Sequence, residues 1–472
     1  TTVATNAALE GKGARTLLIT NNGLEDILRI GRQNRPELYN LTPASNASAV
    51  SQVPTLGCPA RLDAAGNTVA ALTDNDIATI LAAVREIAPE SIALCLLFSY
   101  LNPEHEQRLS QALLSAGFAV SPSHQILPTR GEYERGMATW LNAWLAPRVA
   151  DYLQRLQQAT SPAPLAIMQS HGGTIASQQA ANQAVNLLLS GPAGGLAAAQ
   201  RLGQQLQQPH LMTFDMGGTS TDVALLDGDI RLTQQGRIGP YPVAVPMVDM
   251  HTIGAGGGSL AYVDEAGLLH VGPHSAGADP GPACYGNGGQ HVTVTDANVV
   301  LGRLQPDFAL GGSLTLDVAC AEQAMDRLAV ALNLTRQQTA EGVLALANEH
   351  MTQALRVISI QKGYDPADFA LMSFGGAGGL HVCALADNLG MPRAIVPQRA
   401  GVLSAEGLVY APRKREILQA LPASADEDSL RALIVQLQQQ GSNELIAEGV
   451  SADRIQHRVF VDMCYQGQPS VL

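Results

Sequence analysis

Hydrophobic and polar positions follow two different periods in the first part of the chain. Apolar runs at residues 15–20 and 91–100 predict buried strands, whereas apolar residues at helical spacing predict helices at 75–87 and 103–116. Strands and helices that alternate in this way are typical of parallel β-α-β units. The pattern therefore predicts an α/β fold.

A long helical segment, residues 130–156, contains both tryptophans of the chain. Trp140 and Trp144 are four residues apart and share one face of this helix. We interpret that face as part of the core rather than as a ligand-stacking surface. Pro147 is expected to kink or break the helix.

Glycine-rich loops follow several short apolar strands. Segments 170–174, 215–219, 254–258 and 373–379 each begin near the end of an apolar run. Glycine lets the backbone approach a ligand closely because it has no Cβ. Four such loops are more than chance turns would produce, so we expect them to converge on a ligand.

The composition is that of a globular enzyme rich in small residues. Hydrophobic residues make up 46% and charged residues 15% of the chain, and 46 residues are glycine. The net charge of −13 disfavours nucleic acid and anionic membranes as partners. The longest apolar run, residues 92–98, is too short to span a bilayer, and the first residues lack a signal-peptide pattern. None of the six cysteines forms a C-x-x-C pair, so we expect free thiols and a cytoplasmic location.

The strongest motif is FDMGGTSTDV at residues 214–223. Apolar strands flank it on both sides, which predicts a β-hairpin whose turn directs backbone N–H groups toward one point. Such N–H clusters bind phosphate oxygens. We expect Gly217, Gly218, Thr219 and Thr221 to bind the phosphates of ATP, the threonines through their hydroxyl groups.

Two aspartates, Asp215 and Asp222, flank this turn. Because carboxylates repel phosphate, we explain them by Mg²⁺ between them and the nucleotide, since Mg²⁺ prefers oxygen ligands. The alternative is a glycine turn capped by Asp and Thr side chains. No GxxxxGK[ST] P-loop occurs, and the glycine run at 254–258 lacks the GxGxxG pattern and the later acidic residue of a dinucleotide-binding fold.

A second candidate loop, SFGGAGGLH at residues 373–381, follows a strand and opens a helix. A helix N-terminus offers free N–H donors and the positive end of the helix dipole. We therefore expect Gly375, Gly376 and Gly378 to contact the nucleotide. The alternative is a plain strand-to-helix turn.

Two further side chains are candidates for contact with the substrate or a metal. Asp249 and His251 lie two residues apart on a predicted strand, so they project from the same face. They could form half of a metal site, and the alternative is a hydrogen-bonded core histidine. Cys284 lies in a rigid loop with two prolines and three glycines, residues 277–286, and we interpret it as a structural thiol.

Together these motifs resemble the hydantoinase A/oxoprolinase family, in particular its N-methylhydantoinase A-like subunits. The resemblance covers essentially the whole chain. The matching segments are TTVATNA (1–7), IGRQNRP (30–36), LLFSYLNPEHE (96–106), EYER (132–135), SGPAGG (190–195), DMGGTSTD (215–222), HTIGAGGGS (251–259), GADPGPACYG (277–286), VTDANVVLGRL (294–304) and FGGAG (374–378).

The resemblance implies an actin-like, sugar-kinase-like fold with two ribonuclease-H-like halves, in which mixed sheets are flanked by helices. It implies an ATP- and Mg²⁺-dependent subunit that phosphorylates the carbonyl oxygen of a cyclic amide such as a hydantoin or 5-oxoproline. A hydantoinase B-like companion subunit would complete the hydrolysis, and homo-oligomers are left open. In this hypothesis Asp215 and Asp222 are catalytic residues and metal ligands, and Asp249 and His251 are catalytic residues that face the substrate or metal.

The family pattern also places limits on this expectation. Family members usually carry an additional DxGGTxxD hairpin before the point that corresponds to Thr1, and that first phosphate loop is not in this sequence. We expect three parts: an N-terminal region at 1–120, the main domain at 130–412, and the start of a C-terminal domain at 413–472. Two alternatives to the cyclic-amide hydrolase remain: an ATP-dependent ketone carboxylase subunit, and a catalytically inactive scaffold.

Overall fold

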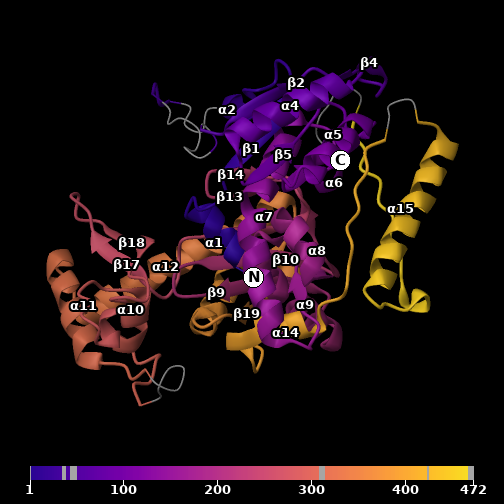
Figure 1. Cartoon of the computed structure of the whole chain (residues 1–472). Helices are drawn as coiled ribbons and strands as arrows, with labels where there is room; N and C mark the ends of the chain where they lie inside the picture. Colours follow the sequence, from indigo (N-terminus) through magenta and orange to yellow (C-terminus); the bar gives the residue numbers. More distant parts are fainter. Residues whose placement is uncertain are drawn as a thin grey trace. The chain divides into compact units, whose positions relative to one another are not determined.

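The computed structural model describes residues 2–34, 39–42, 50, 52–307, 314–421 and 425–465 (Figure 1). Within these ranges the chain forms two compact units. Unit 1 comprises Thr1–Ser190, Thr233–Met247 and Pro412–Leu472, and unit 2 comprises Gly191–Leu232 and Val248–Ala411. The last two positions of the motif at 30–36 lie outside the described residues.

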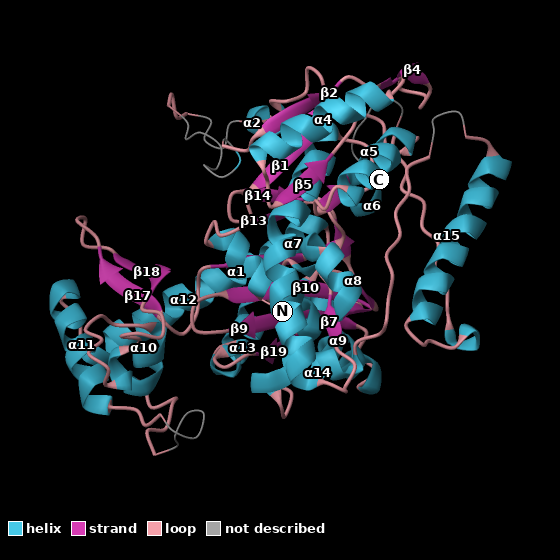
Figure 2. Cartoon of the chain, in the orientation of Figure 1, coloured by secondary structure: helices cyan, strands magenta, loops and turns pink. Residues whose placement is uncertain are grey.

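Unit 1 is built on a parallel sheet with strand order β2-β1-β5-β6. Strands β1, β2 and β5 of this sheet are labelled in Figure 2. This arrangement confirms the parallel β-α-β units expected from the sequence. The elements of this region are β1 (Thr16–Asn21), α2 (Ile27–Ile30), β2 (Thr55–Cys58), β3 (Arg61–Leu62), β4 (Thr68–Ala70), α4 (Asp74–Ile87), β5 (Ser91–Leu94), α5 (Glu104–Ser115), β6 (Val120–Pro122) and α6 (Ser123–Ile126).

One strand boundary differs from the sequence prediction. The strand expected at 91–100 ends at Leu94, because the following residues are buried in turns and Phe98 has φ 58°. Helix α4 is capped by Thr73, whose side chain accepts a hydrogen bond from the Asp76 backbone, while the Asp76 side chain accepts one from the Thr73 backbone. This reciprocal capping box satisfies two backbone donors at the helix start.

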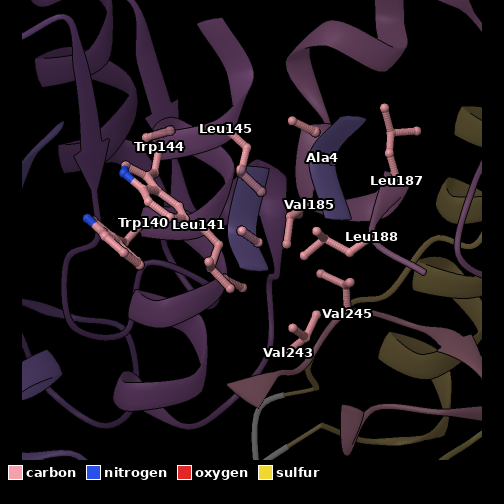
Figure 3. Close-up of a cluster of buried hydrophobic side chains, with 14 of the residues drawn as sticks. Ala4, Trp140, Leu141, Trp144, Leu145, Val185, Leu187, Leu188, Val243 and Val245 are labelled. Atoms are coloured by element: carbon pink, nitrogen blue, oxygen red, sulfur yellow. The ribbon is translucent and has the colours of Figure 1, made fainter. Parts of the chain in front are cut away.

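The largest core of unit 1 surrounds helix α7 (Glu132–Thr160), as Figure 3 shows. Trp140 and Trp144 stack with ring centroids 5.0 Å apart, and both lie against the Tyr241 ring. Buried apolar residues of α1 (Val3–Leu9) and of β14 (Tyr241–Val243) complete the cluster. The core interpretation of the tryptophan face is confirmed. The helix continues through Pro147 without a break.

The remaining elements of unit 1 are short, apart from one C-terminal helix. They are β7 (Ala166–Met168), β8 (Thr174–Ala176), α8 (Ser177–Asn182), η1 (Ala184–Leu187), β13 (Gly236–Ile238), α15 (Glu427–Ala447) and η7 (Ala452–Arg454). Residues 458–465 have no regular secondary structure. No helix in the described part of the chain is long and apolar enough to cross a membrane.

Unit 2 is built on a mixed sheet with strand order β11-β10-β9-β19-β20, and β16 pairs with β10. Strands β9 and β10 are antiparallel, whereas β19 runs parallel to both β9 and β20. The strands are β9 (His210–Met216), β10 (Thr221–Asp227), β11 (Asp229–Ile230), β16 (Met250–Ile253), β17 (Ser259–Val263), β18 (Leu269–Ser275), β19 (Ala370–Phe374) and β20 (Ala394–Ile395). Strands β12 (Leu232–Thr233) and β15 (Met247–Val248) lie where the chain passes between the units.

Helices cover the two faces of this sheet. One core cluster includes Phe214, Val223 and apolar residues of α12 and α13, and the opposite one includes Phe374, Leu403 and alanines of α9. The helices of unit 2 are α9 (Ser190–Gln205), α10 (Val294–Val300), α11 (Val318–Leu332), α12 (Arg336–Ile358), α13 (Val382–Asn388) and α14 (Leu403–Tyr410), with short 3₁₀ turns η2 (Ala283–Tyr285), η3 (Ile360–Lys362), η4 (Pro366–Asp368), η5 (Gly378–Leu380) and η6 (Ala400–Val402).

Candidate nucleotide site

The predicted hairpin is formed by β9, a turn at residues 217–220, and β10. The Gly217 amide donates to the Ser220 carbonyl over 3.0 Å and closes the turn. Asp215 lies directly opposite Asp222 in the antiparallel register. Directly paired residues point to the same face of a sheet. The hairpin therefore brings the two predicted metal ligands together on one face.

Three of the four glycine-rich loops meet at this turn. The amides of Gly257 and Gly258 donate to the carbonyls of Gly217 (3.0 Å) and Gly218 (2.7 Å), and the Ala377 amide donates to the Met216 carbonyl (3.1 Å). The expected convergence is therefore present for the loops of unit 2. The fourth loop, residues 170–174, belongs to unit 1.

The three glycines predicted to contact the nucleotide have different surroundings. Gly375 has φ +83°, and a Cβ there would overlap Asp215 Oδ1 and lie 2.5 Å from the Met216 carbonyl oxygen. Gly376 is exposed, with open space around a built Cβ, whereas Gly378 is buried against the Ser373 hydroxyl and the Phe214 ring. Gly375 is thus required for the close approach of this loop to Asp215, and Gly376 is the most accessible of the three.

The two threonines of the motif are placed differently. Gly218 and Thr219 are exposed at the tip of the turn. Thr221 is buried, and its hydroxyl donates to the Ala255 carbonyl over 2.5 Å. Thr219 is therefore available to a ligand, whereas the Thr221 hydroxyl holds the loop at 254–258 against the hairpin.

The negatively charged forms of the two aspartates are disfavoured in this position. Burial, and then the charge of Asp222, raise the pKa of Asp215 from 3.8 to about 6, although a hydrogen bond with Ser404 partly opposes the shift. Burial also raises the pKa of Asp222, and its hydrogen bond with Thr252 opposes that shift. Two partly buried carboxylates that face each other favour a bound cation. The donor set therefore fits Mg²⁺.

The raised pKa predicts how the nucleotide-free protein responds to pH. Because the folded protein holds the Asp215 proton more tightly than the unfolded chain does, this group stabilises the fold as pH falls through the window from about 6 to 3.8. We expect a contribution on the order of 1–2 kcal/mol between pH 7 and pH 5. Thermal unfolding of the wild type and of Asp215→Asn across this range isolates it, since the variant lacks the group. Parallel profiles would contradict the raised pKa.

Apolar residues surround the carboxylates on this face of the sheet. A small pocket is lined by both aspartates, by Pro192 and Leu196 of α9, and by Phe374 of β19. Helix α14 approaches α9 closely at Gly407, where a Cβ would overlap the Gly194 carbonyl. This contact positions α14, whose Ser404 hydrogen bonds to Asp215.

Asp249 and His251 do not lie beside the Asp215 and Asp222 carboxylates. His251 is paired with Val223, whereas Thr252 is paired with Asp222, so alternation along β16 places His251 on the face opposite the two aspartates. Asp249 forms an ion pair with Lys362, with Oδ2 and Nζ 2.5 Å apart. The structure does not bring these two residues to the Asp215 carboxylate. Within the described ranges, no three His, Cys, Asp or Glu side chains are grouped as metal ligands.

Two site residues were not identified from the sequence. Thr252 donates its hydroxyl to Asp222 Oδ1 over 2.7 Å, and Ser404 hydrogen bonds to Asp215. Thr252 lies inside the HTIGAGGGS motif, but only the pairing of β16 with β10 shows which way it points. No sequence signal indicated Ser404. Burial and the neighbouring Asp296 raise the pKa of the Cys284 thiol well above its usual range, which agrees with the structural interpretation.

Loss of the Thr252 hydroxyl is expected to weaken metal binding. Thr252→Val removes the donor that orients Asp222, and loss of such an outer partner reduces metal affinity about tenfold. Titration of Mg²⁺ into the protein with ATP present measures this change. The control is Thr68→Val, an exposed strand threonine of unit 1, which should leave the affinity unchanged. Equal affinities for both variants would remove Thr252 from the site.

The sequence of the chain matches a known protein family and several of its members. Residues 135–417 match the hydantoinase/oxoprolinase family, and residues 1–117 match the hydantoinase/oxoprolinase N-terminal region. The caprolactamase alpha subunit of Pseudomonas jessenii is 34% identical over 99% of this chain and 70% of its own length. The 5-oxoprolinase 1 of Arabidopsis thaliana is 31% identical over the whole chain and 40% of its own length.

Solved structures show the same fold. The crystal structure of ATP-dependent caprolactamase from Pseudomonas jessenii has a TM-score of 0.88 and 33% identity, and covers all of this chain and 70% of that one. The nucleotide-free structure of acetone carboxylase has a TM-score of 0.74 and 29% identity, with the same coverage. These similarities confirm the expected actin-like α/β fold with mixed sheets flanked by helices. The chain belongs to the hydantoinase/oxoprolinase family.

Proposed function

We propose that this chain is the ATP-using subunit of a cyclic-amide hydrolase, in which it phosphorylates the carbonyl oxygen of the substrate. The observation that carries the proposal is the pair Asp215 and Asp222 on one face of a glycine-turn hairpin. Relatives in sequence are named caprolactamase and 5-oxoprolinase, and the two solved relatives, a caprolactamase and an acetone carboxylase, are both described as ATP-dependent.

The hairpin and its neighbouring loop have distinct parts in this proposal. Asp215 and Asp222 hold Mg²⁺ or its water ligands, with Thr252 and Ser404 orienting their carboxylates. The phosphates are bound by the turn at Gly217 and Gly218, which includes the Gly218 backbone amide. The exposed hydroxyl of Thr219 also faces them. Gly375 and Gly376 contact the nucleotide from the loop that follows β19. Gly378 and Thr221 support these loops from within the fold, and Asp249 and His251 take no part in the nucleotide step.

The chemistry explains why a cyclic amide requires such a site. An amide carbonyl is a poor electrophile, and bound ATP supplies the phosphoryl group that turns its oxygen into a leaving group. Phosphoryl transfer depends mainly on positioning and on neutralisation of charge. The chain supplies both through the loop amides and through two carboxylates that hold the neutralising cation.

A companion subunit completes the reaction in this proposal. One relative is named as an alpha subunit, which fits a multi-subunit enzyme. We propose a hydantoinase B-like partner that hydrolyses the phosphorylated intermediate. We place the reaction in the cytoplasm, where ATP is available.

Substrate-dependent ATP turnover tests the function. The chain, with its companion subunit, is assayed for ADP release with hydantoin, 5-oxoproline or caprolactam, and separately with acetone or acetophenone plus hydrogencarbonate. The proposal expects cyclic amides to stimulate ADP release. Stimulation only by ketone and hydrogencarbonate would favour the carboxylase alternative, which the likeness to the acetone carboxylase structure supports. No stimulation by either class would favour the scaffold alternative.

A further inference from the structure

The loop at residues 275–281 lies against the turn of the β9–β10 hairpin. The Gly258 amide donates to the Gly218 carbonyl over 2.7 Å, and the Ala276 amide donates to the Gly258 carbonyl over 2.9 Å. A Cβ built on Gly258 would lie 3.0 Å from the Gly218 oxygen and 3.8 Å from the Gly277 oxygen. The backbone of this loop therefore lies beside the exposed end of the turn to which we assign phosphate binding.

The loop carries a carboxylate, that of Asp279. The Gly281 amide donates to the Ala276 carbonyl over 3.3 Å, which closes the loop around Asp279. Pro280 and Pro282 restrict the backbone that follows. Asp279 is exposed, and no hydrogen bond or ion pair engages its carboxylate within the described ranges. The carboxylate is therefore available to a ligand and is held on a restricted support.

The other acids near this end of the hairpin are already engaged. Asp215 and Asp222 face each other as the proposed metal ligands. Asp296 is buried and accepts hydrogen bonds from three backbone amides and one hydroxyl group. Its oxygens support the fold of the segment around Cys284 and are not open to a substrate. Among the acids considered, Asp279 is the one that remains free to accept a proton beside the turn.

The nearest histidine in sequence points away from the turn. His274 precedes Ser275 at the end of β18, and the Ser275 hydroxyl lies 3.0 Å from a Cβ built on Gly258. Successive side chains of a strand point to opposite faces. The face that Ser275 turns toward the glycine loop is therefore not the face of His274.

Phosphorylation of an amide oxygen releases a proton that a base must accept. The carbonyl oxygen forms a bond to the γ-phosphorus while the bond between that phosphorus and ADP breaks, and the electron pair of that bond leaves with ADP. The ring C–N bond becomes C=N, and the N–H proton is lost. Positive charge develops on the nitrogen as the O–P bond forms, so the N–H becomes acidic enough for transfer to a carboxylate.

We propose that Asp279 is the general base that removes the proton from the ring nitrogen while the carbonyl oxygen of the substrate is phosphorylated. This inference rests on the proposed function. A small cyclic amide presents its N–H and its C=O side by side. The phosphate turn and the Asp279 loop are also side by side, so the oxygen faces the γ-phosphate while the N–H donates to the carboxylate. The substrate class is therefore a cyclic amide that keeps an N–H next to the reacting carbonyl.

Asp279→Asn tests this assignment in the full chain with its companion subunit. ADP release is measured against the concentration of whichever cyclic amide stimulates the wild type. We expect kcat to fall at least about a hundredfold. KM for the amide should change by less than about threefold, because the asparagine oxygen still accepts the N–H hydrogen bond. Binding of ATP with Mg²⁺ should be unchanged. Asp279→Glu, which restores a carboxylate, should return kcat to within about tenfold of the wild type.

The substrate itself provides a second test. The N-methyl derivative of the same amide has no N–H to lose, so it should not stimulate ADP release by the wild type. The control variant is Glu265→Gln, which removes an exposed carboxylate at the other end of the β17–β18 hairpin. It should keep the wild-type kcat.

The possible failures are distinguishable. No stimulation of the wild type by any cyclic amide would overturn the proposed function, and this inference with it. Stimulation that Asp279→Asn retains within about threefold would overturn the inference alone. Equal losses of kcat in Asp279→Asn and Asp279→Glu would also overturn it, because the residue would then act through the shape of the loop. Equal stimulation by the N-methyl amide would contradict proton removal from nitrogen.

Discussion

Asp215→Asn is expected to lower ATP turnover by at least about a thousandfold without loss of the fold. The substitution keeps the size of the side chain but removes one of the two negative charges that hold the cation. The nucleotide-free variant should unfold at the same temperature as the wild type or higher, because a partly buried carboxylate with a pKa of about 6 is replaced by a neutral group. A substitution that lowers turnover but raises the unfolding temperature identifies a residue that destabilises the fold when its ligand is absent.

The control for this prediction lies on the same hairpin. Asp227 is exposed at the far end of β10, where it pairs with His210 over 2.8 Å. Asp227→Asn makes the same chemical change away from the turn, so turnover should change by less than about twofold, as for an exposed pair. ADP release measures turnover, and thermal unfolding measures stability. If both variants kept wild-type turnover, Asp215 would have no part in catalysis.

Gly375→Ala is expected to lower the free energy of unfolding by about 2–4 kcal/mol and to abolish nucleotide binding. Two costs add together. The left-handed backbone at φ +83° disfavours any side chain, and the new Cβ would lie 2.5 Å from the Met216 carbonyl oxygen while overlapping Asp215 Oδ1. The loop must then move away from the carboxylate that it approaches.

The neighbouring glycine provides the matched control. Gly376 is exposed and has no atom near a built Cβ, so Gly376→Ala should change stability by less than about 0.5 kcal/mol. Chemical unfolding of both variants measures the difference. Similar stabilities for the two would show that the loop does not depend on the close approach at Gly375.

The hairpin was predictable because its information is local. The motif at 214–223 combines apolar strands, a glycine turn and two aspartates, and a tight turn fixes the register that makes Asp215 and Asp222 directly opposed. The parallel sheet of unit 1 followed from alternating strand and helix patterns in the same way. Neither inference required knowledge of distant contacts.

Features that depend on distant pairing were not predictable. Residues 95–100 are as buried and apolar as a strand, yet they form turns, and periodicity cannot separate the two. The rule that residues two apart share a strand face applies to Asp249 and His251, but only the register with β10 shows which face that is. Ser404 reaches Asp215 because α14 lies against α9, a contact with no local signal.

The burial of Arg135 was not predictable from the sequence either. Its motif was recognised, but an arginine in the first turn of a long helix is ordinarily exposed. Its burial follows from the position of α7 beside β5 and from backbone carbonyls at Leu96 and Thr129 that accept its hydrogen bonds. Only the assembled unit shows these contacts.

The most direct test of the central claim is calorimetric titration of ATP into this chain, with Mg²⁺ present or with the cation removed by chelation, for the wild type and for Asp215→Asn. The account predicts binding by the wild type that depends on Mg²⁺ and is lost in the variant. Binding of equal strength in both proteins, or wild-type binding that is unchanged by chelation, would contradict the assignment of Asp215 and Asp222 as the cation site of an ATP-using subunit.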